Sequence, residues 1–512
     1  MGILRGIEMG FAKTFGGVSV AIGMMTAPAA WADVTAGQVW ADFKGYMEGF
    51  GYSITAEEAQ DAGRLTVTGI SMTMQMPEDA GTATFEAPDM SFTDNGDGTV
   101  SVTMPEMSTL DFAVDAEDEG DVSGTIDYGQ TGFAMTVSGS PGDMFYDYSA
   151  DEMSVALSSL AVEGESVQID TAQFTIRDMQ GQSTVKLDDL RRVAQRMTMG
   201  ALAYELDMVS PEDDGGRLTM KGELTSPEFD GTLATPLEPL DSDDPNAMIE
   251  AGMAVDGGFT HSGGRTEFRF VEEDDAVEGT ASSESGEVSV RMDAGQMGYT
   301  LGARGLNLRA ESAELPFPVE LAMAESLLDF TVPVTPGEEP QDFGLTLTLG
   351  DFTMSDMIWQ MFDPAGQLPR DPATVALDLK GKARLDAPLM APETMESDEA
   401  PGELRELSIS SLIVRLAGAE LTGVGDFTFD NTDTTTFDGM PRPEGALDLR
   451  LVGGNTLLDT LVNMGMLPQE QAMGARMMMG LFAVPGDGED TLTSKIEVNE
   501  AGQVLANGQR LR

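Results

Sequence analysis

The sequence predicts a mainly β protein, with a largely antiparallel sheet and a few short helices packed on it. Apolar and polar residues alternate with period 2 over much of the chain, and the alternating segments are separated by Gly, Asp and Pro. Segments with helical spacing are few and short. Since 41% of the 512 residues are apolar, the chain can bury a core despite its charge.

The first 32 residues predict a secretory signal. Arg5 and Lys13 are basic, residues 15–27 are apolar and small, and Ala30-Trp31-Ala32 forms a cleavage site before Asp33. The alternative is an uncleaved anchor, but the apolar run is shorter than the roughly 20 residues that span a bilayer. No later apolar run approaches that length. We therefore expect a mature chain of residues 33–512, without a transmembrane segment, in the periplasm.

Composition excludes several classes of function. The chain has no Cys and one His, so it offers no disulfide, no thiolate nucleophile and no Cys-ligated zinc or iron–sulfur site. Its 88 acidic and 28 basic residues give a net charge of −60, and such a surface repels nucleic acid. We expect no nucleic-acid partner, no cofactor and no enzymatic activity.

The alternating segments predict the strands. In the first of them, Leu65 and Val67 share a face, and a phase change at Gly69 predicts a β-bulge. After the bulge, one face carries Ile70, Met72, Met74 and Met76. A turn at residues 94–98 is expected to join Phe92 to a strand with Val100, Val102 and Met104. Later strands carry the sets Leu345, Leu347 and Leu349; Val375, Leu377 and Leu379; Leu412, Val414 and Leu416; Leu447, Leu449 and Leu451; and Leu492, Ser494, Ile496 and Val498.

Helical spacing predicts five short helices. They cover residues 35–50, residues 188–199, a segment from Ser355 to Pro364, residues 455–465, and a segment from Pro468 to Pro485. The last two predict a helical hairpin packed on the sheet. Residues 344–361 and 445–462 share one pattern of glycine, alternating leucines, polar turn and amphipathic helix, which suggests two related strand–helix modules. We also expect the mature chain to form two similar halves, of about residues 33–245 and 246–512. Residues 386–402 are acidic and rich in proline, and we expect a disordered loop there.

Two groups of residues are candidate sites. Met72, Met74 and Met76 could bind copper(I) through their thioethers, but Met is used as an ordinary apolar residue throughout, so a flexible apolar face is the favoured interpretation. Oxygen ligands for calcium cluster in two loops, at Asp94, Asn95 and Asp97 and at Asp430, Asn431, Asp433 and Asp438. Neither cluster has EF-hand spacing, and hairpin turns use the same residues, so both are weak calcium candidates.

Catalytic and carbohydrate sites have little support. His261 lies in a polar turn, where a solvated imidazole is expected, and Ser282, Ser283 and Ser285 are expected in a loop. Aromatic residues are 6% of the chain, which is little for a carbohydrate platform. After the signal, the only tryptophans are Trp40 and Trp359, both on predicted helices.

Three segments carry resemblances to known families. Residues 342–364 resemble an uncharacterised exported family of alphaproteobacteria, a domain of unknown function, and that resemblance covers most of the mature chain. Residues 412–430 resemble the strand pairs of AsmA-like envelope proteins, and residues 502–511 are similar to the end of YdgA-like periplasmic proteins. These resemblances imply an extended, curved antiparallel sheet in the periplasm and no known enzymatic activity.

Two functions remain open. The first is a non-enzymatic envelope protein whose sheet forms a scaffold or groove that binds lipid or another envelope protein. The alternative is a calcium- or carbohydrate-binding, adhesin-like surface protein. A lipid groove requires an open row of apolar side chains that no helix covers, whereas a calcium module requires carbonyl oxygens converging on Asp430 or Asp94.

Overall fold

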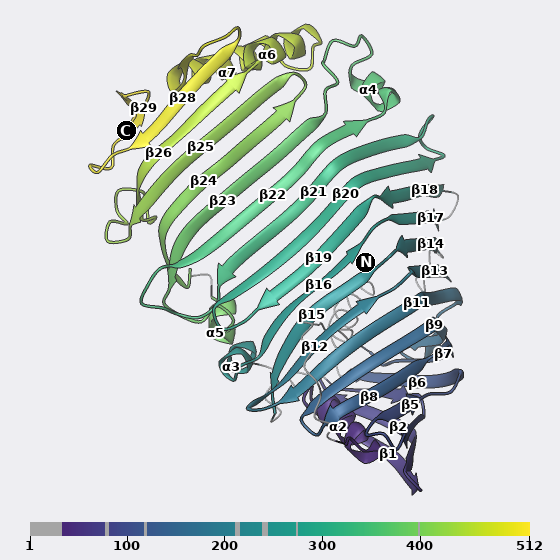
Figure 1. Cartoon of the computed structure of the whole chain (residues 1–512). Coiled ribbons are helices and arrows are strands. Elements are labelled where there is room, and N and C mark those ends of the chain that lie inside the picture. The colour runs from purple at the N-terminus through teal and green to yellow at the C-terminus, as the bar shows by residue number, and fades with distance from the viewer. Residues whose placement is uncertain are drawn as a thin grey trace. The chain divides into compact units, whose positions relative to one another are not determined.

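The structure, a computed structural model, describes residues 33–76, 81–116, 120–209, 216–237, 244–272, 275–397 and 400–512. It is mainly β, with a large antiparallel sheet and, within these ranges, six short helices (Figure 1). This confirms the predicted fold class. The expected signal, residues 1–32, lies outside the described residues. No helix in the described ranges has the length and apolar character that crossing a membrane requires.

The chain divides into two compact units. The first ends at Thr280 and also takes Ser289–Ala294 and Ser312–Glu314, and the second takes the remainder. The division therefore falls further along the chain than residue 245, and the similarity of two halves stays a prediction. Up to β19, the elements are α2 (Ala36–Glu48), β1 (Tyr52–Asp61), β2 (Arg64–Gln75), β3 (Gly81–Ala87), β4 (Met90–Asp94), β5 (Val100–Thr103), β6 (Met107–Ala116), β7 (Val122–Thr131), β8 (Ala134–Ser140), β9 (Asp143–Val162), β10 (Glu165–Ser166), β11 (Ile169–Leu187), β12 (Leu190–Thr198), β13 (Ala201–Val209), β14 (Arg217–Thr225), β15 (Glu228–Pro236), α3 (Pro245–Glu250), β16 (Ala254–His261), β17 (Gly264–Glu272), β18 (Asp275–Ser283) and β19 (Ser285–Met292).

From β20 onward, all elements belong to the second unit apart from the last residue of β20. They are β20 (Gln296–Ser312), β21 (Val319–Pro333), β22 (Gln341–Met354), α4 (Asp356–Phe362), β23 (Ala373–Leu385), α5 (Pro392–Met395), β24 (Gly402–Leu416), β25 (Ala419–Asp430), β26 (Arg442–Val452), α6 (Gly454–Asn463), α7 (Gln469–Phe482), β27 (Val484–Pro485), β28 (Thr491–Val498), β29 (Val504–Ala506) and β30 (Gln509–Arg510). Strands β20 to β26 and then β28 pair in chain order, all antiparallel.

Helix α2 packs on the sheet of the first unit. Its Val39 and Trp40 are buried in one cluster with Ile70 and Phe92, and Trp40 stacks on Phe43 at 5.6 Å between ring centroids. The predicted bulge is present, because the register of β1 against β2 shifts opposite Gly69, which has a φ of +60°. The shift lets β2 bury side chains on one face both before and after it.

The prediction of a helix over residues 188–199 is wrong, because Leu190–Thr198 form β12. Leu190, Val193 and Met197 have helical spacing, but the buried positions are Arg191, Val193 and Gln195, which alternate. Polar side chains take two of the buried positions, so the pattern of apolar residues did not report the face that is buried.

The other predicted helices are confirmed as α4, α6 and α7. Ser355 is the N-cap residue of α4 but makes no side-chain capping hydrogen bond. The start of α6 is capped by Asp490, a residue distant in sequence. The Asp490 carboxylate, just before β28, accepts hydrogen bonds from the backbone N–H groups of Asn455 and Thr456 at 3.2 and 2.7 Å. These two hydrogen bonds join the start of the α6–α7 hairpin to the sheet.

Part of the expected disordered segment, residues 386–402, adopts structure. It contains α5, and its Leu389 N–H donates to the Val334 carbonyl at 2.8 Å. Residues 398–399 lie outside the described ranges.

Candidate apolar binding face

Eight strands of the second unit line up an apolar row, which we name the central row. Residues that are paired across an antiparallel ladder point to the same face of the sheet. Following the register from β20 to β28 gives the members in order: Leu301, Leu328, Leu347, Leu377, Leu412, Gly423, Leu449 and Ser494. Seven strand spacings of about 4.8 Å make this row about 34 Å long.

Two flanking rows extend the same face. One contains Tyr299, Phe330, Leu345, Leu379, Ile409, Gly425, Leu447 and Ile496, and the other contains Ala303, Ser326, Leu349, Val375, Val414, Leu421, Leu451 and Leu492. The register shift in β24 keeps both Ile409 and Leu412 on this face. None of the three rows contains a charged residue. We refer to the three rows together as the apolar face.

The apolar face is open in this structure. Leu301 is 46% exposed and Val375 is 40% exposed, and the other large side chains of the three rows are exposed or half-buried. Among the described residues, no member of the rows belongs to a buried hydrophobic cluster. A contiguous row of exposed and half-buried apolar side chains of this kind is characteristic of a site of interaction.

Helices cover only the margin of this face. The one buried cluster found among the described residues of this unit combines Trp359 of α4 with Leu368 and Ala417, and Leu457 and Leu461 of α6 pack against it. Ala417 lies in the turn after β24, at the end of a strand. The hairpin is held at the β28 edge, where the Ser494 hydroxyl donates to the carbonyl of Phe482, the last residue of α7, at 2.6 Å.

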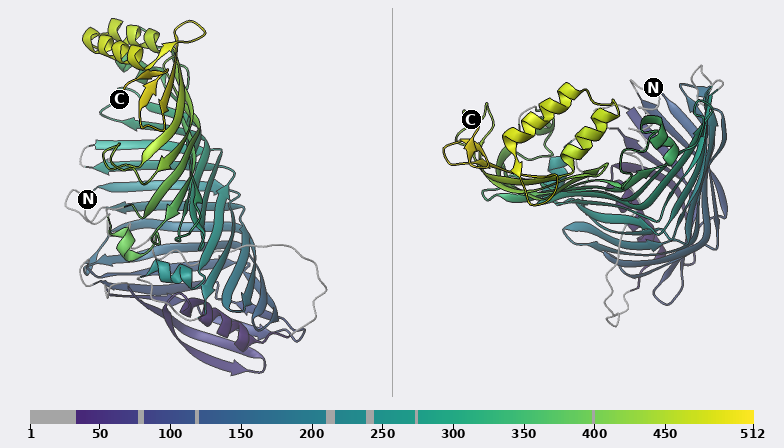
Figure 2. Two further views of the ribbon diagram at one scale, coloured as in Figure 1. Left: turned by 90° about the vertical axis from the view of Figure 1, so that its left-hand side faces the viewer. Right: turned by 90° about the horizontal axis from the view of Figure 1, so that it is seen from above.

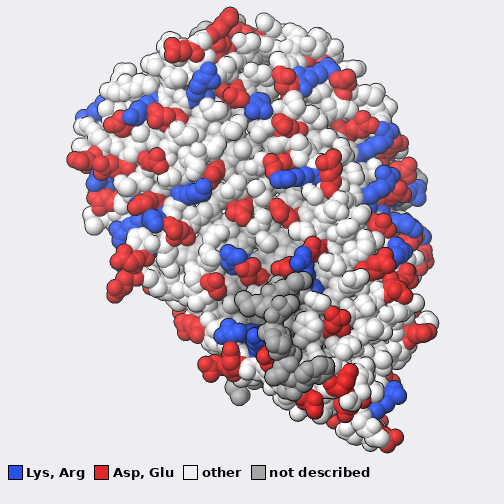
Figure 3. All heavy atoms as spheres, viewed as in Figure 1, with Lys and Arg blue, Asp and Glu red and all other residues white. Residues whose placement is uncertain are grey.

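The opposite face of the same strands is polar. Thr346, Asp378 and Ser411 are paired across β22, β23 and β24 one position away from the central row, so they point to the other side. Helices α6 and α7 stand on one side of the strands (Figure 2), and the other side, seen in Figure 3, carries acidic and basic side chains. The sheet of this unit is therefore amphipathic across its thickness.

The predicted methionine face lies in the first unit. Met72 is paired with Ile54 and Phe85, and Met74 is paired with Tyr52 and Ala83, so both share a face as predicted. Met76 lies beyond the last residue of β2, and Met72 packs against the cluster under α2. The neighbours of Met72 and Met74 across the ladder are hydrocarbon or aromatic, which is the environment of an apolar face.

The carboxylates of the predicted calcium loops are engaged in hydrogen bonds. Asp94 accepts from the N–H of Ala36 at the start of α2 at 2.7 Å, and Asp97 accepts from Thr99. Asp430 and Asp433 both bind the guanidinium of Arg442, at 2.8 and 3.3 Å. Within the described ranges, no group of three His or acidic side chains is placed to hold a metal ion. Whether either loop binds calcium stays a prediction.

The Asp430–Arg442 contact predicts a pH dependence. Hydrogen bonds from Thr432 and Arg442 lower the pKa of Asp430 from 3.8 to about 2. A carboxyl with a lowered pKa in the folded state contributes stability fully above its unfolded pKa and loses it as the pH falls through the folded pKa. We expect the stabilisation to be constant above about pH 5 and to disappear between about pH 4 and 2.

The measurement is the difference in free energy of unfolding between the wild type and Asp430→Asn as a function of pH. Asp487→Asn, an exposed position in the same unit, is the control and is expected to leave the profile unchanged. A difference between the wild type and Asp430→Asn that does not change below pH 4 would contradict the assignment.

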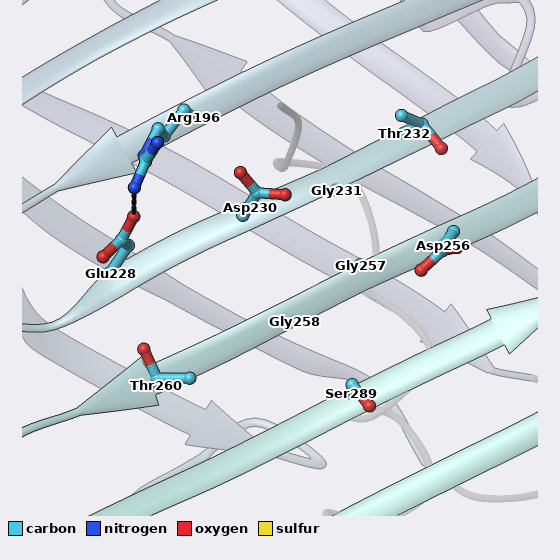
Figure 4. A pocket seen from close by; sticks show the side chains of 10 residues that line it. All are labelled: Arg196, Glu228, Asp230, Gly231, Thr232, Asp256, Gly257, Gly258, Thr260 and Ser289. Atoms are coloured by element: carbon cyan, nitrogen blue, oxygen red, sulfur yellow. Dashed lines mark hydrogen bonds and ion pairs between the residues drawn. The ribbon is translucent and has the colours of Figure 1, made fainter. Parts of the chain in front are cut away.

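The first unit has a polar hollow of about 510 Å³ (Figure 4). Glu228, Asp230 and Asp256 line it, Arg196 binds Glu228, and glycines form part of its wall. Asp256 is ion-paired with Arg291 at 2.6 Å, and no aromatic side chain lines the hollow. The arrangement offers neither a stacking platform for a sugar nor a cluster of free ligands for a cation.

The remaining predicted residues do not converge on a catalytic arrangement. His261 ends β16, and its Nδ1 is 3.0 Å from the carbonyl oxygen of Gly263 in the following turn. The prediction of a loop at Ser282, Ser283 and Ser285 is wrong, because the first two end β18 and the third begins β19.

Comparison with protein families gives a match to the second half of the chain. No curated protein and no solved structure matches the chain. The matching segment runs from β16 to β30 and includes the whole apolar face. Residues 259–510 match the model of a family described as "Uncharacterized protein conserved in bacteria (DUF2125)".

Proposed function

We propose that this chain is a non-enzymatic protein of the bacterial envelope, exported to the periplasm, that holds lipid acyl chains on the apolar face of its second unit. The single observation that supports this most is the central row, an open line of leucines across neighbouring strands. The row supports the proposal because the helical hairpin reaches it only at its β28 end, where Ser494 bonds to the end of α7. The Asp430 and Asp433 carboxylates already bind Arg442, and Asp94 accepts from the Ala36 N–H, so these contacts favour the lipid proposal over a calcium module.

Hydrocarbon fits this face better than a peptide does. Within the ladder, the backbone N–H and C=O groups of the strands bond to each other, so the middle of the face offers a peptide backbone no partner. The three rows carry methyl groups and two aromatic rings but no charge. A bilayer core of about 30 Å holds two leaflets, so one acyl chain needs about 15 Å, and the central row is long enough for it.

A second copy of the chain is a weaker candidate for the same face. Two copies would bring together chains with a formal charge of −60 each, and this repulsion opposes association. A neutral or zwitterionic lipid carries no such penalty.

The test is native mass spectrometry and lipid extraction of the full mature chain, purified from its own envelope without detergent. We expect bound fatty acid or phospholipid in the wild type and its loss in Leu377→Gln/Leu412→Gln. Each amide that faces hydrocarbon without a partner costs about 2 kcal/mol, which weakens binding roughly thirtyfold per substitution.

The matched control changes the other face of the same strands. Thr346→Gln/Ser411→Gln places two amides on the polar side, and bound lipid is expected to remain. A bare monomeric wild-type mass would refute the lipid proposal. A bare dimer that Leu377→Gln/Leu412→Gln dissociates would assign the face to self-association.

A further inference from the structure

Helix α7 carries an apolar stripe that faces solvent. Met473, Met477 and Leu481 are spaced by four residues and so share one face of the helix. Met473 is 65% exposed, Met477 is 72% exposed and Leu481 is 49% exposed. The neighbouring Met478 is also exposed, so the stripe is wide, and we call these four residues the α7 stripe.

The α6–α7 hairpin is nearly free of charge in a strongly acidic chain. Between Gly454 and Phe482, the charged residues are Asp459, Glu470 and Arg476. Arg476 is directed to α6, since its guanidinium binds Asp459 at 2.5 Å and the carbonyl of Asn455 at 3.4 Å. Glu470 lies in the first turn of α7, and the other charged residue of this helix, Arg476, is ion-paired with Asp459 of α6.

The hairpin is held so that the stripe stays outward. Asp490 binds the start of α6, and Ser494 and Asn507 both donate to the carbonyl of Phe482 at the end of α7. The side of α7 toward the protein buries Ala472, which leaves the stripe without a partner in the described structure. With 14 residues, α7 is about 21 Å long, too short to span a bilayer but suited to lie in its interface.

We propose that the α7 stripe docks the protein on the surface of a zwitterionic lipid bilayer. An interfacial helix binds through buried apolar area, and unbranched methionine adapts to an irregular lipid surface. The low charge of the hairpin reduces the electrostatic cost at the point of contact, whereas the chain as a whole, at −60, is repelled by anionic lipid. The expected partner is therefore a phosphatidylcholine- or phosphatidylethanolamine-type surface and not an anionic one.

The test is flotation of the full mature chain with phosphatidylcholine vesicles. We expect the wild type to float with the vesicles. In Met473→Gln/Met477→Gln/Leu481→Gln, the partition coefficient is expected to fall at least about tenfold, because the buried apolar area of the contact is lost. The matched control, Met107→Gln/Met395→Gln/Met440→Gln, replaces three comparably exposed methionines elsewhere and is expected to float like the wild type. Vesicles enriched in phosphatidylglycerol are expected to bind the wild type less.

Several outcomes would overturn this proposal. They are a wild type that stays with the soluble fraction, equal losses in the two triple variants, or stronger binding to phosphatidylglycerol. Lipid extraction of the same samples separates this contact from the apolar face. An α7 stripe variant that loses flotation but keeps bound lipid would sustain the docking proposal, whereas a wild type that floats without bound lipid would refute only the groove.

Discussion

Asp42→Ala is expected to lower the free energy of unfolding of the first unit by about 3–5 kcal/mol, because it leaves a guanidinium buried without its counter-charge. Arg191 of β12 donates to the Asp42 carboxylate of α2 at 2.7 Å and to its backbone carbonyl at 3.1 Å. Both side chains are buried, and the Arg191 Nε has no partner even in the wild type. Urea unfolding followed by far-ultraviolet circular dichroism measures the change.

The Tyr146 hydroxyl adds to the loss. It donates to Asp42 at 2.6 Å, and burial together with the Asp42 charge raises the pKa of this phenol, so it stays a hydrogen-bond donor. In Asp42→Ala, a second buried polar group therefore loses its partner.

Two further variants test whether the unpaired buried charge causes the loss of stability. Asp42→Leu/Arg191→Met removes both charges and is expected to recover the part of the stability that the unpaired guanidinium costs, since a buried ion pair contributes little over hydrocarbon of similar volume. The part due to the Tyr146 hydroxyl stays lost. Arg192→Ala removes an exposed ion pair with Asp188 at 3.4 Å and is expected to cost less than about 1 kcal/mol. A double variant as unstable as Asp42→Ala would show that burial of charge is not the cause.

Much of the fold could be predicted from local pattern. Alternation located the leucine strands of the second unit, since Leu345, Leu347 and Leu349 lie in β22 as expected. Capping residues and prolines located α4, α6 and α7 within a few residues. In both cases, the residues that predict the strand or helix all lie within one short segment of the chain.

The candidate site could be predicted only in part. The alternating leucines of single strands were visible, but the central row depends on the register between eight strands, and register arises from contacts distant in sequence. Leu301 and Leu328, which begin that row, were not singled out. Whether a helix covers the face is also a long-range property, so the sequence left open the feature that the function depends on.

The methionine prediction and the wrong helix prediction at β12 have the same cause, which is that a local pattern does not report contacts between residues distant in sequence. Met72 and Met74 share a face as predicted, yet the larger open surface consists of leucine in the other unit. At β12, Arg191 is buried because Asp42, 149 residues earlier in the chain, provides its partner. A local pattern treats arginine as exposed and could not anticipate this contact.

Trp40→Ala is expected to cost the first unit about 3–5 kcal/mol, since it leaves a large cavity between α2 and the sheet. Trp40 is 2% exposed, and its ring lies 5.6 Å from that of Phe43 and 6.0 Å from that of Phe92. Its indole N–H also donates to Glu58 at 2.6 Å. Urea unfolding followed by far-ultraviolet circular dichroism measures the loss without depending on the substituted fluorophore.

Trp40→Phe separates packing from the hydrogen bond, because phenylalanine keeps an aromatic ring on Phe92 but has no donor for Glu58. We expect it to cost about 1–2 kcal/mol, a minor part of the effect of alanine, since Glu58 also binds Lys44 at 2.9 Å and stays in contact with solvent. Equal losses for phenylalanine and alanine would place the contribution of Trp40 in its hydrogen bond. A small loss for both would mean that α2 is held mainly by the Asp42–Arg191 pair, in which case Asp42→Ala should release the helix while the strands beneath it stay protected from hydrogen exchange.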